Sequence, residues 1–283
     1  MDGFEGKTAV VTGAGSGMGR AMALRFAEAG SRIVLADVDE EGMASVVAEI
    51  QSNSGEAIAV TTDVADADAN DRLSAAALET FGQYNVVCLN AGVTGSVGRS
   101  WTLTEQDWDW SLGVLLHGVT HGIRSFVPHL ISHGDGHVVI TASIAGHIAS
   151  AYSGPYAVAK HGVATLAETL YHELAIDEST VGVTCLCPGF VNTNIVAAAR
   201  ARGAADEEVG ADKDERGRRW LDMSERFLST GLDPAVVGQQ VHDAILAKQF
   251  WLFTDEMWDD AIALRAEEIT HRLPPTVGMP RRG

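Results

Sequence analysis

Short apolar runs alternate with longer amphipathic stretches along most of the chain. The apolar runs predict strands over residues 7–12, 31–36, 56–62, 84–89, 135–142, 180–187 and 249–253. The stretches between them predict helices over residues 17–29, 39–52, 66–80, 104–132, 155–177, 233–247 and 255–270. Strands that alternate with helices in this way form a parallel sheet covered on both faces. The pattern therefore predicts an α/β fold, a Rossmann-like doubly wound parallel sheet of about seven strands.

One segment interrupts the alternation. Residues 194–228 have apolar ends around a charged middle, which suits a lid over a substrate; a solvated helical hairpin or an oligomer contact is the alternative. A chain of 283 residues otherwise fits one domain, because doubly wound sheets commonly exceed the average domain length. We expect a single domain over residues 1–283, with a lid at about 194–228 and a C-terminal extension at about 255–283.

A glycine-rich loop follows the first predicted strand. Residues 7–12 run into Gly13-Ala-Gly-Ser-Gly-Met-Gly19, and a helical pattern follows. Glycines allow positive φ and close approach of a ligand, and the free N–H groups of a first helical turn suit a pyrophosphate. Asp37 ends the second predicted strand, where its carboxylate can accept hydrogen bonds from ribose hydroxyls and repel a 2′-phosphate. These features predict a dinucleotide site that prefers NAD.

A second set of polar residues predicts acid–base chemistry. Tyr156 lies four residues before Lys160, which places the phenol and the ammonium on one face of a helix. A cation beside a phenol favours the phenolate and lowers its pKa toward the working range. Ser143 ends the apolar run that begins at Val138, so a strand tip could present its hydroxyl to the same substrate oxygen. Without the rest of the chain, a surface pair one turn apart would be the more ordinary interpretation of the Tyr-Lys pair.

Together these motifs resemble the short-chain dehydrogenase/reductase family from Gly6 to about Phe253. Residues 12–19 are similar to its Thr-Gly-x3-Gly-x-Gly cofactor loop, and Pro188-Gly-Phe-Val-Asn-Thr193 is similar to the stretch that touches the nicotinamide. The resemblance implies the catalytic residues Ser143, Tyr156 and Lys160 and no metal. It implies cofactor contacts at Gly13, Ser16, Gly17, Met18, Gly19, Asp37, Asp63, Val64, Asn90, Gly92, Tyr156, Lys160, Pro188, Gly189, Val191 and Thr193.

One position departs from the family pattern. The family places an asparagine in the helix before the fifth strand, where it holds a local kink and supports a water in a proton relay, but Leu115 stands there in this chain. A backbone carbonyl could still bind the water. Ser111 lies one turn earlier on the same helical face and is the best-placed substitute side chain.

The resemblance implies an NAD-dependent oxidoreductase that interconverts a secondary alcohol and a ketone. An aldehyde or steroid-type carbonyl reductase of the same family is the alternative, and a catalytically silent NAD-binding scaffold is a further one because of Leu115. The pocket candidates favour an apolar or aromatic substrate and are Ile144, Tyr152, Phe190, Ile195, Trp220, Met223 and Phe227. In the family, the helix that contains Gly113, Gly118 and Gly122 packs between subunits with the Tyr156 helix, which implies a homotetramer or homodimer.

Charge and composition restrict the classes of partner that the protein can bind. Asp and Glu total 38 against 20 Lys and Arg, and a net charge of −18 repels nucleic acid and acidic membranes. We expect no membrane partner, because no apolar run approaches the roughly 18 residues that span a bilayer, and a cytoplasmic location, because the N-terminus does not resemble a signal peptide. Cys88, Cys185 and Cys187 fit reduced, buried thiols. The i, i+4 histidine pairs on the 104–132 helix lack the pattern of a zinc site, and His147 lies four residues after Ser143, where a packed or solvated imidazole is the ordinary interpretation.

Overall fold

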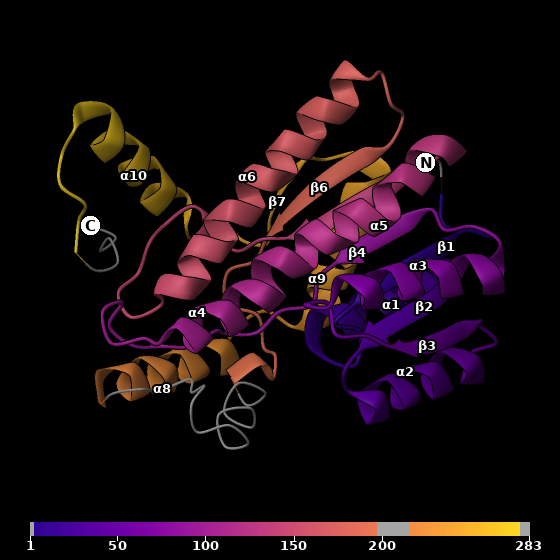
Figure 1. Cartoon of the computed structure of the whole chain (residues 1–283), viewed down its shortest axis with the longest axis horizontal. Coiled ribbons are helices and arrows are strands. Elements are labelled where there is room, and N and C mark those ends of the chain that lie inside the picture. Colours follow the sequence, from indigo (N-terminus) through magenta and orange to yellow (C-terminus); the bar gives the residue numbers. More distant parts are fainter. Residues whose placement is uncertain (1–2, 197–214, 278–283) are drawn as a thin grey trace.

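The computed structural model describes residues 3–196 and 215–277, and they build one parallel sheet covered on both faces. Its seven strands have the order β3-β2-β1-β4-β5-β6-β7 (Figure 1). The strands are β1 Thr8–Thr12, β2 Arg32–Asp37, β3 Ala57–Thr61, β4 Val86–Leu89, β5 His137–Thr141, β6 Gly182–Cys187 and β7 Trp251–Phe253. The order reverses between β1 and β4, so the carboxyl ends of these strands face a crevice at the switch point, where ligands of such sheets bind. The predicted fold class is confirmed.

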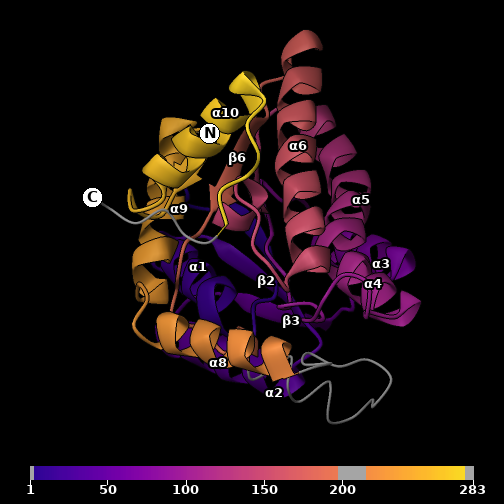
Figure 2. The ribbon, with the colours of Figure 1, turned by 90° about the vertical axis from the view of Figure 1, so that its left-hand side faces the viewer.

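Alternate residues of the strands pack against two separate helical layers. Val10 belongs to one core cluster and its neighbours Ala9 and Val11 to the other, because successive side chains of a strand point to opposite faces. One layer contains α3 Ala67–Phe81, α5 Gly118–His133 and α6 Gly154–Ile176; the other contains α1 Gly17–Glu28, α2 Glu40–Ser52 and α9 Pro234–Ala247. Figure 2 shows α5 and α6 on one side of the sheet and α1 and α9 on the other.

The predicted helix over 104–132 is interrupted. The chain forms α4 Glu105–Leu112, then a π-helical turn over Gly113–His117, and only then α5. Leu115 lies in this turn and is fully buried. A π-helical turn within a longer helix is frequently found near a functional site.

The C-terminal third contains the remaining elements. Of the predicted lid, residues 197–214 lie outside the described residues, and the part after them forms α8 Glu215–Ser229. The last helix, α10 Asp259–His271, begins four residues later than expected. No helix among the described residues is long and apolar enough to cross a membrane.

Candidate active site

The glycine loop is built for close contacts. Gly13 has φ +67°, and a Cβ there would lie 2.8 Å from the Cα of Ala91. A Cβ on Gly19 would lie 2.0 Å from the carbonyl oxygen of Gly13, so any side chain at position 19 would displace the loop. α1 begins at Gly17, and the side chain of its N-cap residue Ser16 makes no capping hydrogen bond. The first-turn amides are therefore available to an anionic group.

Asp37 stands beside this loop. Its Oδ2 accepts a hydrogen bond from the backbone N–H of Gly15 at 2.9 Å, and its Oδ1 accepts one from Asp39 at 3.1 Å. The two bonds hold the half-buried carboxylate at the end of β2, next to the glycine turn. This is the position at which a ribose-binding acid is needed.

Hydrogen bonds connect the carboxyl ends of β1, β4 and β5. Thr12 Oγ1 accepts from the backbone N–H groups of Asn90 and Ala91 at 2.9 and 3.0 Å, and Asn90 Nδ2 donates to the Thr12 carbonyl at 3.0 Å. Thr141 Oγ1 donates to Asn90 Oδ1 at 3.2 Å, and Lys160 Nζ donates to the Thr141 carbonyl at 2.7 Å. The cofactor loop and the lysine are thus held in one network. Sequence reasoning missed Thr12 and Thr141 as members of it, because only the strand order makes them neighbours.

Ser143, Tyr156 and Lys160 come together at this edge. Lys160 is buried in the second turn of α6, with Nζ 5.8 Å from the centre of the Tyr156 ring. Burial lowers the pKa of Lys160 to about 8, against a smaller upward effect of Cys185 and Cys187. Ser143 is 7% exposed, and its Oγ accepts a hydrogen bond from Ala145 at 3.1 Å.

The tyrosine pKa differs from the expectation. Burial raises the pKa of Tyr156, and the hydrogen bond with Ser143 lowers it by less. A neighbouring cation was expected to dominate, but the Lys160 ammonium is bonded to the Thr141 carbonyl rather than to the phenol. Burial, rather than the cation, therefore sets the direction of the Tyr156 pKa shift in this structure.

The other predicted cofactor residues after the loop occupy the same edge. A Cβ on Gly17 would lie 3.0 Å from Cγ2 of Thr193, so the stretch after β6 reaches the start of α1. The Pro188 carbonyl accepts from Ile144 at 2.9 Å, and Gly189 N–H donates to Thr254 Oγ1 at 3.1 Å. Val191 is buried and forms a bridge with Leu232.

The residues expected near the adenine lie after β3. Asp63 is exposed, and its carboxylate accepts a hydrogen bond from the Ala65 amide at 3.0 Å. Val64 is buried against Gly118, where a Cβ would lie 2.8 Å from the valine side chain. Met18 and Gly92 are not fully buried, and Gly92 lies close to the Leu115 side chain.

Leu115 and Ser111 behave as packing and structural residues. The Leu115 side chain has no exposed surface, and Ser111 Oγ donates to the Asp107 carbonyl at 2.7 Å while accepting from the Ser96 amide at 3.0 Å. The bond from the Ser96 amide holds the loop after β4 against α4, and the bond to the Asp107 carbonyl lies within α4. The geometry therefore does not support Ser111 as a substitute for the relay asparagine. Asp107, fully buried, also accepts from Ser96 Oγ at 2.8 Å, a contact with no signal in the sequence.

A third apolar cluster joins the loop after β4, the segment before α6 and the described parts of the predicted lid. Its buried members are Val97, Val196 and Leu221, and its half-buried members are Trp110, Tyr152, Ile195, Trp220 and Leu228. The rings of Phe190 and Phe227 stack at 5.0 Å, and Trp258 approaches Phe190 edge-on at 5.5 Å. Of the pocket candidates, Tyr152, Ile195 and Trp220 are in the cluster, Phe190 and Phe227 form the stack, Ile144 is buried, and Met223 is 47% exposed.

Clusters of metal ligands do not appear in the described part of the chain, where no three His, Cys, Asp or Glu side chains gather as a possible ligand set. The predicted i, i+4 histidine pairs stack ring on ring instead, with centroids 6.3 Å apart for His117 and His121 and 6.0 Å apart for His129 and His133.

Comparisons with known proteins agree with this geometry. The family described as short chain dehydrogenase matches residues 7–203. A C alpha-dehydrogenase of Sphingobium sp. is 34% identical over 87% of this chain and 79% of its own length. A 1-deoxy-11-beta-hydroxypentalenate dehydrogenase of Streptomyces exfoliatus is 36% identical over 78% of this chain and 81% of its own length.

A solved structure extends the likeness to the whole fold. The crystal structure of a short chain dehydrogenase/reductase from Burkholderia phymatum in complex with NAD is 37% identical, has a TM-score of 0.94, and covers 99% of this chain and 100% of its own. The glycine loop, the parallel sheet and the three converging polar residues are thus accompanied by a family match over more than half of the sequence. This chain belongs to the short-chain dehydrogenase/reductase family.

Proposed function

We propose that this oxidoreductase interconverts a secondary alcohol and a ketone, with NAD as its cofactor. The observation that carries the proposal is the convergence of Ser143, Tyr156 and Lys160 beside the glycine loop. A phenol, a hydroxyl and an ammonium group at one strand edge can orient a carbonyl oxygen and exchange a proton with it.

The residues of the loop fit a dinucleotide. Gly13 and Gly17 have φ +67° and +52°, a conformation in which any side chain would be strained. Because glycine has no side chain, a ligand can approach the backbone closely at both positions. Asp37 would accept the adenosine ribose hydroxyls and oppose a 2′-phosphate, which favours NAD over NADP. When bound, the nicotinamide supplies a hydride acceptor for the alcohol or a hydride donor for the ketone.

The three polar residues have separate roles. Tyr156 gives a proton to the substrate oxygen in ketone reduction and takes it back in alcohol oxidation. Ser143 orients the substrate oxygen. Lys160, fixed by the Thr141 carbonyl, supplies a positive charge beside the phenol and a donor for the nicotinamide ribose.

The substrate is apolar or aromatic. The support is the apolar cluster around Val97 and Leu221 and the stacked rings of Phe190 and Phe227, which together contain most of the pocket candidates from the sequence. Both relatives described above are named as dehydrogenases. An aldehyde or steroid-type carbonyl reductase would use the same polar residues.

A panel of secondary alcohols with NAD or NADP tests the proposal. We expect NADH to form, measured by absorbance, with aromatic or bulky apolar alcohols ahead of short polar ones. Leu115 favours a second candidate, a catalytically silent NAD-binding protein, because the relay side chain is missing. Tight NAD binding without turnover of any alcohol, ketone or aldehyde would support that candidate and contradict ours.

The assembly is a homotetramer or a homodimer in this proposal. A groove of about 460 Å³ between α5 and α6 is lined by apolar side chains that include Val127 and Leu170, and Ile131 and Ile176 at its border are 45% and 80% exposed. Analytical ultracentrifugation measures the assembly directly, and Ile131→Glu should shift it toward monomers. The three free, buried cysteines support a reducing, cytoplasmic location.

A further inference from the structure

Two features of the sequence have no part in the function proposed above, and the fold brings them together. His147 follows the 3-10 turn Ile144–Gly146, and Cys187 is the last residue of β6. The imidazole Nε2 lies 3.3 Å from the Cys187 sulfur, and the sulfur of Cys185 lies 3.7 Å from that of Cys187. His147 lies four residues after Ser143, and Cys187 directly precedes Pro188, so the pair connects the segment of the catalytic serine to the nicotinamide stretch.

The His147–Cys187 pair is suited to a structural role rather than to a reaction. The neighbouring Cys185 and burial both raise the pKa of the Cys187 thiol, and burial lowers the pKa of His147, helped by the nearby charges of His161 and Arg265. A neutral imidazole therefore meets a neutral thiol, and the thiol donates onward to the Cys185 carbonyl at 3.7 Å. Buried neutral thiols are poor nucleophiles, so a role in holding the backbone fits better than a reaction at sulfur.

The turn that starts at Ser143 is fixed at both ends by β6. At its start, the Ile144 amide donates to the Pro188 carbonyl at 2.9 Å. The backbone of Ser143 interacts with the Cys187 sulfur and lowers the pKa of that thiol, by less than Cys185 and burial raise it. At its end, His147 contacts the same sulfur. In between, a Cβ on Gly146 would lie 2.7 Å from the Lys160 carbonyl, so the turn is pressed against α6.

The imidazole ring has a second set of contacts. Its centroid lies 5.1 Å from that of Trp251 and 5.2 Å from that of Phe253, both on β7. Ring packing and the sulfur contact are therefore separable: a phenyl ring can keep the first and lose the second.

We propose that His147 and Cys187 are positioning residues that fix the direction of the Ser143 hydroxyl through the 143–147 turn. The proposal rests on the function proposed above, because Ser143 must act on the substrate oxygen. Loss of the His147–Cys187 contact frees the end of the turn, and small displacements of a catalytic group are costly to the rate.

The test compares three variants of the full-length protein. His147→Phe keeps the ring contacts with Trp251 and Phe253 and removes the N–H donor; Cys187→Ser keeps a polar acceptor and serves as the conservative variant. Cys88→Ala is the matched control, since it removes a buried thiol from β4 that packs in the core cluster on the opposite face of the sheet from Cys187. We expect His147→Phe to lose kcat on the order of tenfold to a hundredfold. KM for NAD and the melting temperature should stay close to those of the wild type. Cys187→Ser should retain most of the rate, and Cys88→Ala should be fully active.

A Ser143→Ala background identifies the route of the effect. If the pair acts through Ser143, His147→Phe has no further effect on kcat in that background. Equal losses in both backgrounds, a fully active His147→Phe, or a loss of kcat that follows melting temperature or NAD affinity would each overturn the proposal. A wild-type protein that turns over no substrate overturns the proposed function and this proposal with it, whereas an active wild type beside a fully active His147→Phe overturns only the positioning role.

Discussion

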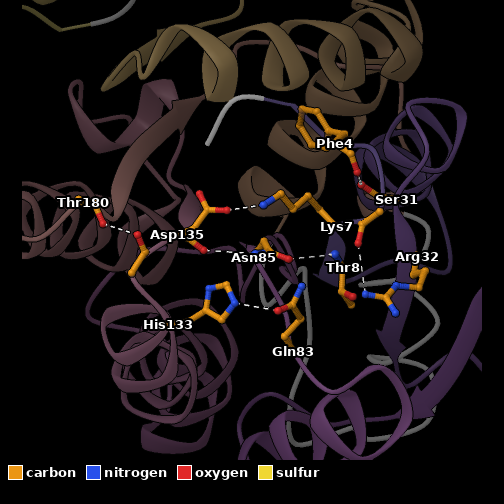
Figure 3. Close-up of polar contacts among 12 residues, drawn as sticks. Phe4, Lys7, Thr8, Ser31, Arg32, Gln83, Asn85, His133, Asp135 and Thr180 are labelled. Atoms are coloured by element: carbon orange, nitrogen blue, oxygen red, sulfur yellow. Dashed lines mark hydrogen bonds and ion pairs between the residues drawn. The ribbon is translucent and has the colours of Figure 1, made fainter.

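The two ends of the parallel sheet carry similar polar residues that serve different purposes. At the amino end, Asn85 accepts from the Thr8 amide at 3.2 Å and donates to the Asp135 carbonyl at 3.3 Å, and Lys7 pairs with the Asp135 carboxylate (Figure 3). At the carboxyl end, Asn90 makes a comparable set of bonds to Thr12 and Thr141.

The difference lies in what each network surrounds. The contacts drawn in Figure 3 join loops and strand starts to each other, including His133 to Gln83 and Ser31 to the Phe4 carbonyl. The network at the carboxyl end instead leads to Lys160, beside a phenol and a glycine turn suited to a ligand. Residues of one chemical type thus stabilise the fold at one end and prepare a site at the other. Changes at the amino end should lower stability alone, and changes at the carboxyl end should lower the rate.

The largest expected effect is on Tyr156. Tyr156→Phe removes the proton-exchanging hydroxyl and should lower kcat by roughly 10²- to 10⁴-fold, with NAD affinity unchanged. Tyr84→Phe is the matched control, because Tyr84 is fully buried and its hydroxyl hydrogen-bonds to Ser74 at 2.9 Å away from the site. The control should lose about 1 kcal/mol of stability and no activity. Steady-state kinetics and thermal melting separate the two, and a Tyr156→Phe variant at near-wild-type rates would remove the tyrosine from the mechanism.

Lys160 gives the next largest effect, on stability as a function of pH. Its pKa in the folded protein is about 8, below the ordinary value of 10.5, so the folded state binds fewer protons than the unfolded state between these values. Burial of the charge therefore destabilises the protein fully below about pH 8, and this loss disappears as pH rises toward 10.5. Relative to Lys160→Met, the wild type should gain about 3 kcal/mol across this window. Urea unfolding of both proteins below and above the window measures it; a constant difference would contradict the buried charge.

The sequence predicted the fold and the candidate site to different extents. The strand-helix alternation gave the seven-stranded sheet, and the family was recognised from the glycine loop and the motifs that follow it. Asp37 and Tyr156 were identified as candidates from their residue type and their distance along the chain from a motif residue, which a sequence displays directly. The roles of Thr12 and Thr141 depend on strands β1, β4 and β5 lying side by side, which one sequence shows only after the sheet order is known.

The substrate side was harder to predict for a physical reason. Apolar side chains such as Val97 and Trp258 carry no motif, and their neighbours are remote in the chain. The π-helical turn around Leu115 was also missed, because its residues have ordinary helical periodicity. The tyrosine pKa was expected in the wrong direction because the sequence does not reveal how far burial raises the pKa of this phenol, nor that Lys160 is bonded to the Thr141 carbonyl.

Variants of Asp37 and Asp135 compare the roles of a carboxylate at the two ends of the sheet. Asp37→Ala removes the acceptor for ribose hydroxyls and the charge that opposes a 2′-phosphate. The ratio of kcat/KM for NAD to that for NADP should fall by roughly 10- to 100-fold, the equivalent of about 1.5–3 kcal/mol. Asp135→Ala loses the pair with Lys7 and should lower the melting temperature without changing this ratio. Equal use of both cofactors by the wild type would contradict the role of Asp37.

Substitution of Ser111 should have the smallest effect and gives the sharpest test. Ser111 lies close to the site, but its contacts stabilise the fold. Ser111→Ala leaves the buried Ser96 amide without its acceptor and should cost about 1–3 kcal/mol of stability with kcat unchanged. Leu115→Asn buries an amide where the leucine side chain has no exposed surface, and it should cost a similar amount of stability.

Urea unfolding and kcat for both variants decide between two interpretations of the π-helical turn. A stable but slow Ser111→Ala, together with a tolerated or faster Leu115→Asn, would show that this helix carries the proton path through Ser111 and that the sequence-based expectation was correct. Two destabilised variants with wild-type kcat would show that the turn only packs, so that proton exchange needs no side chain from it.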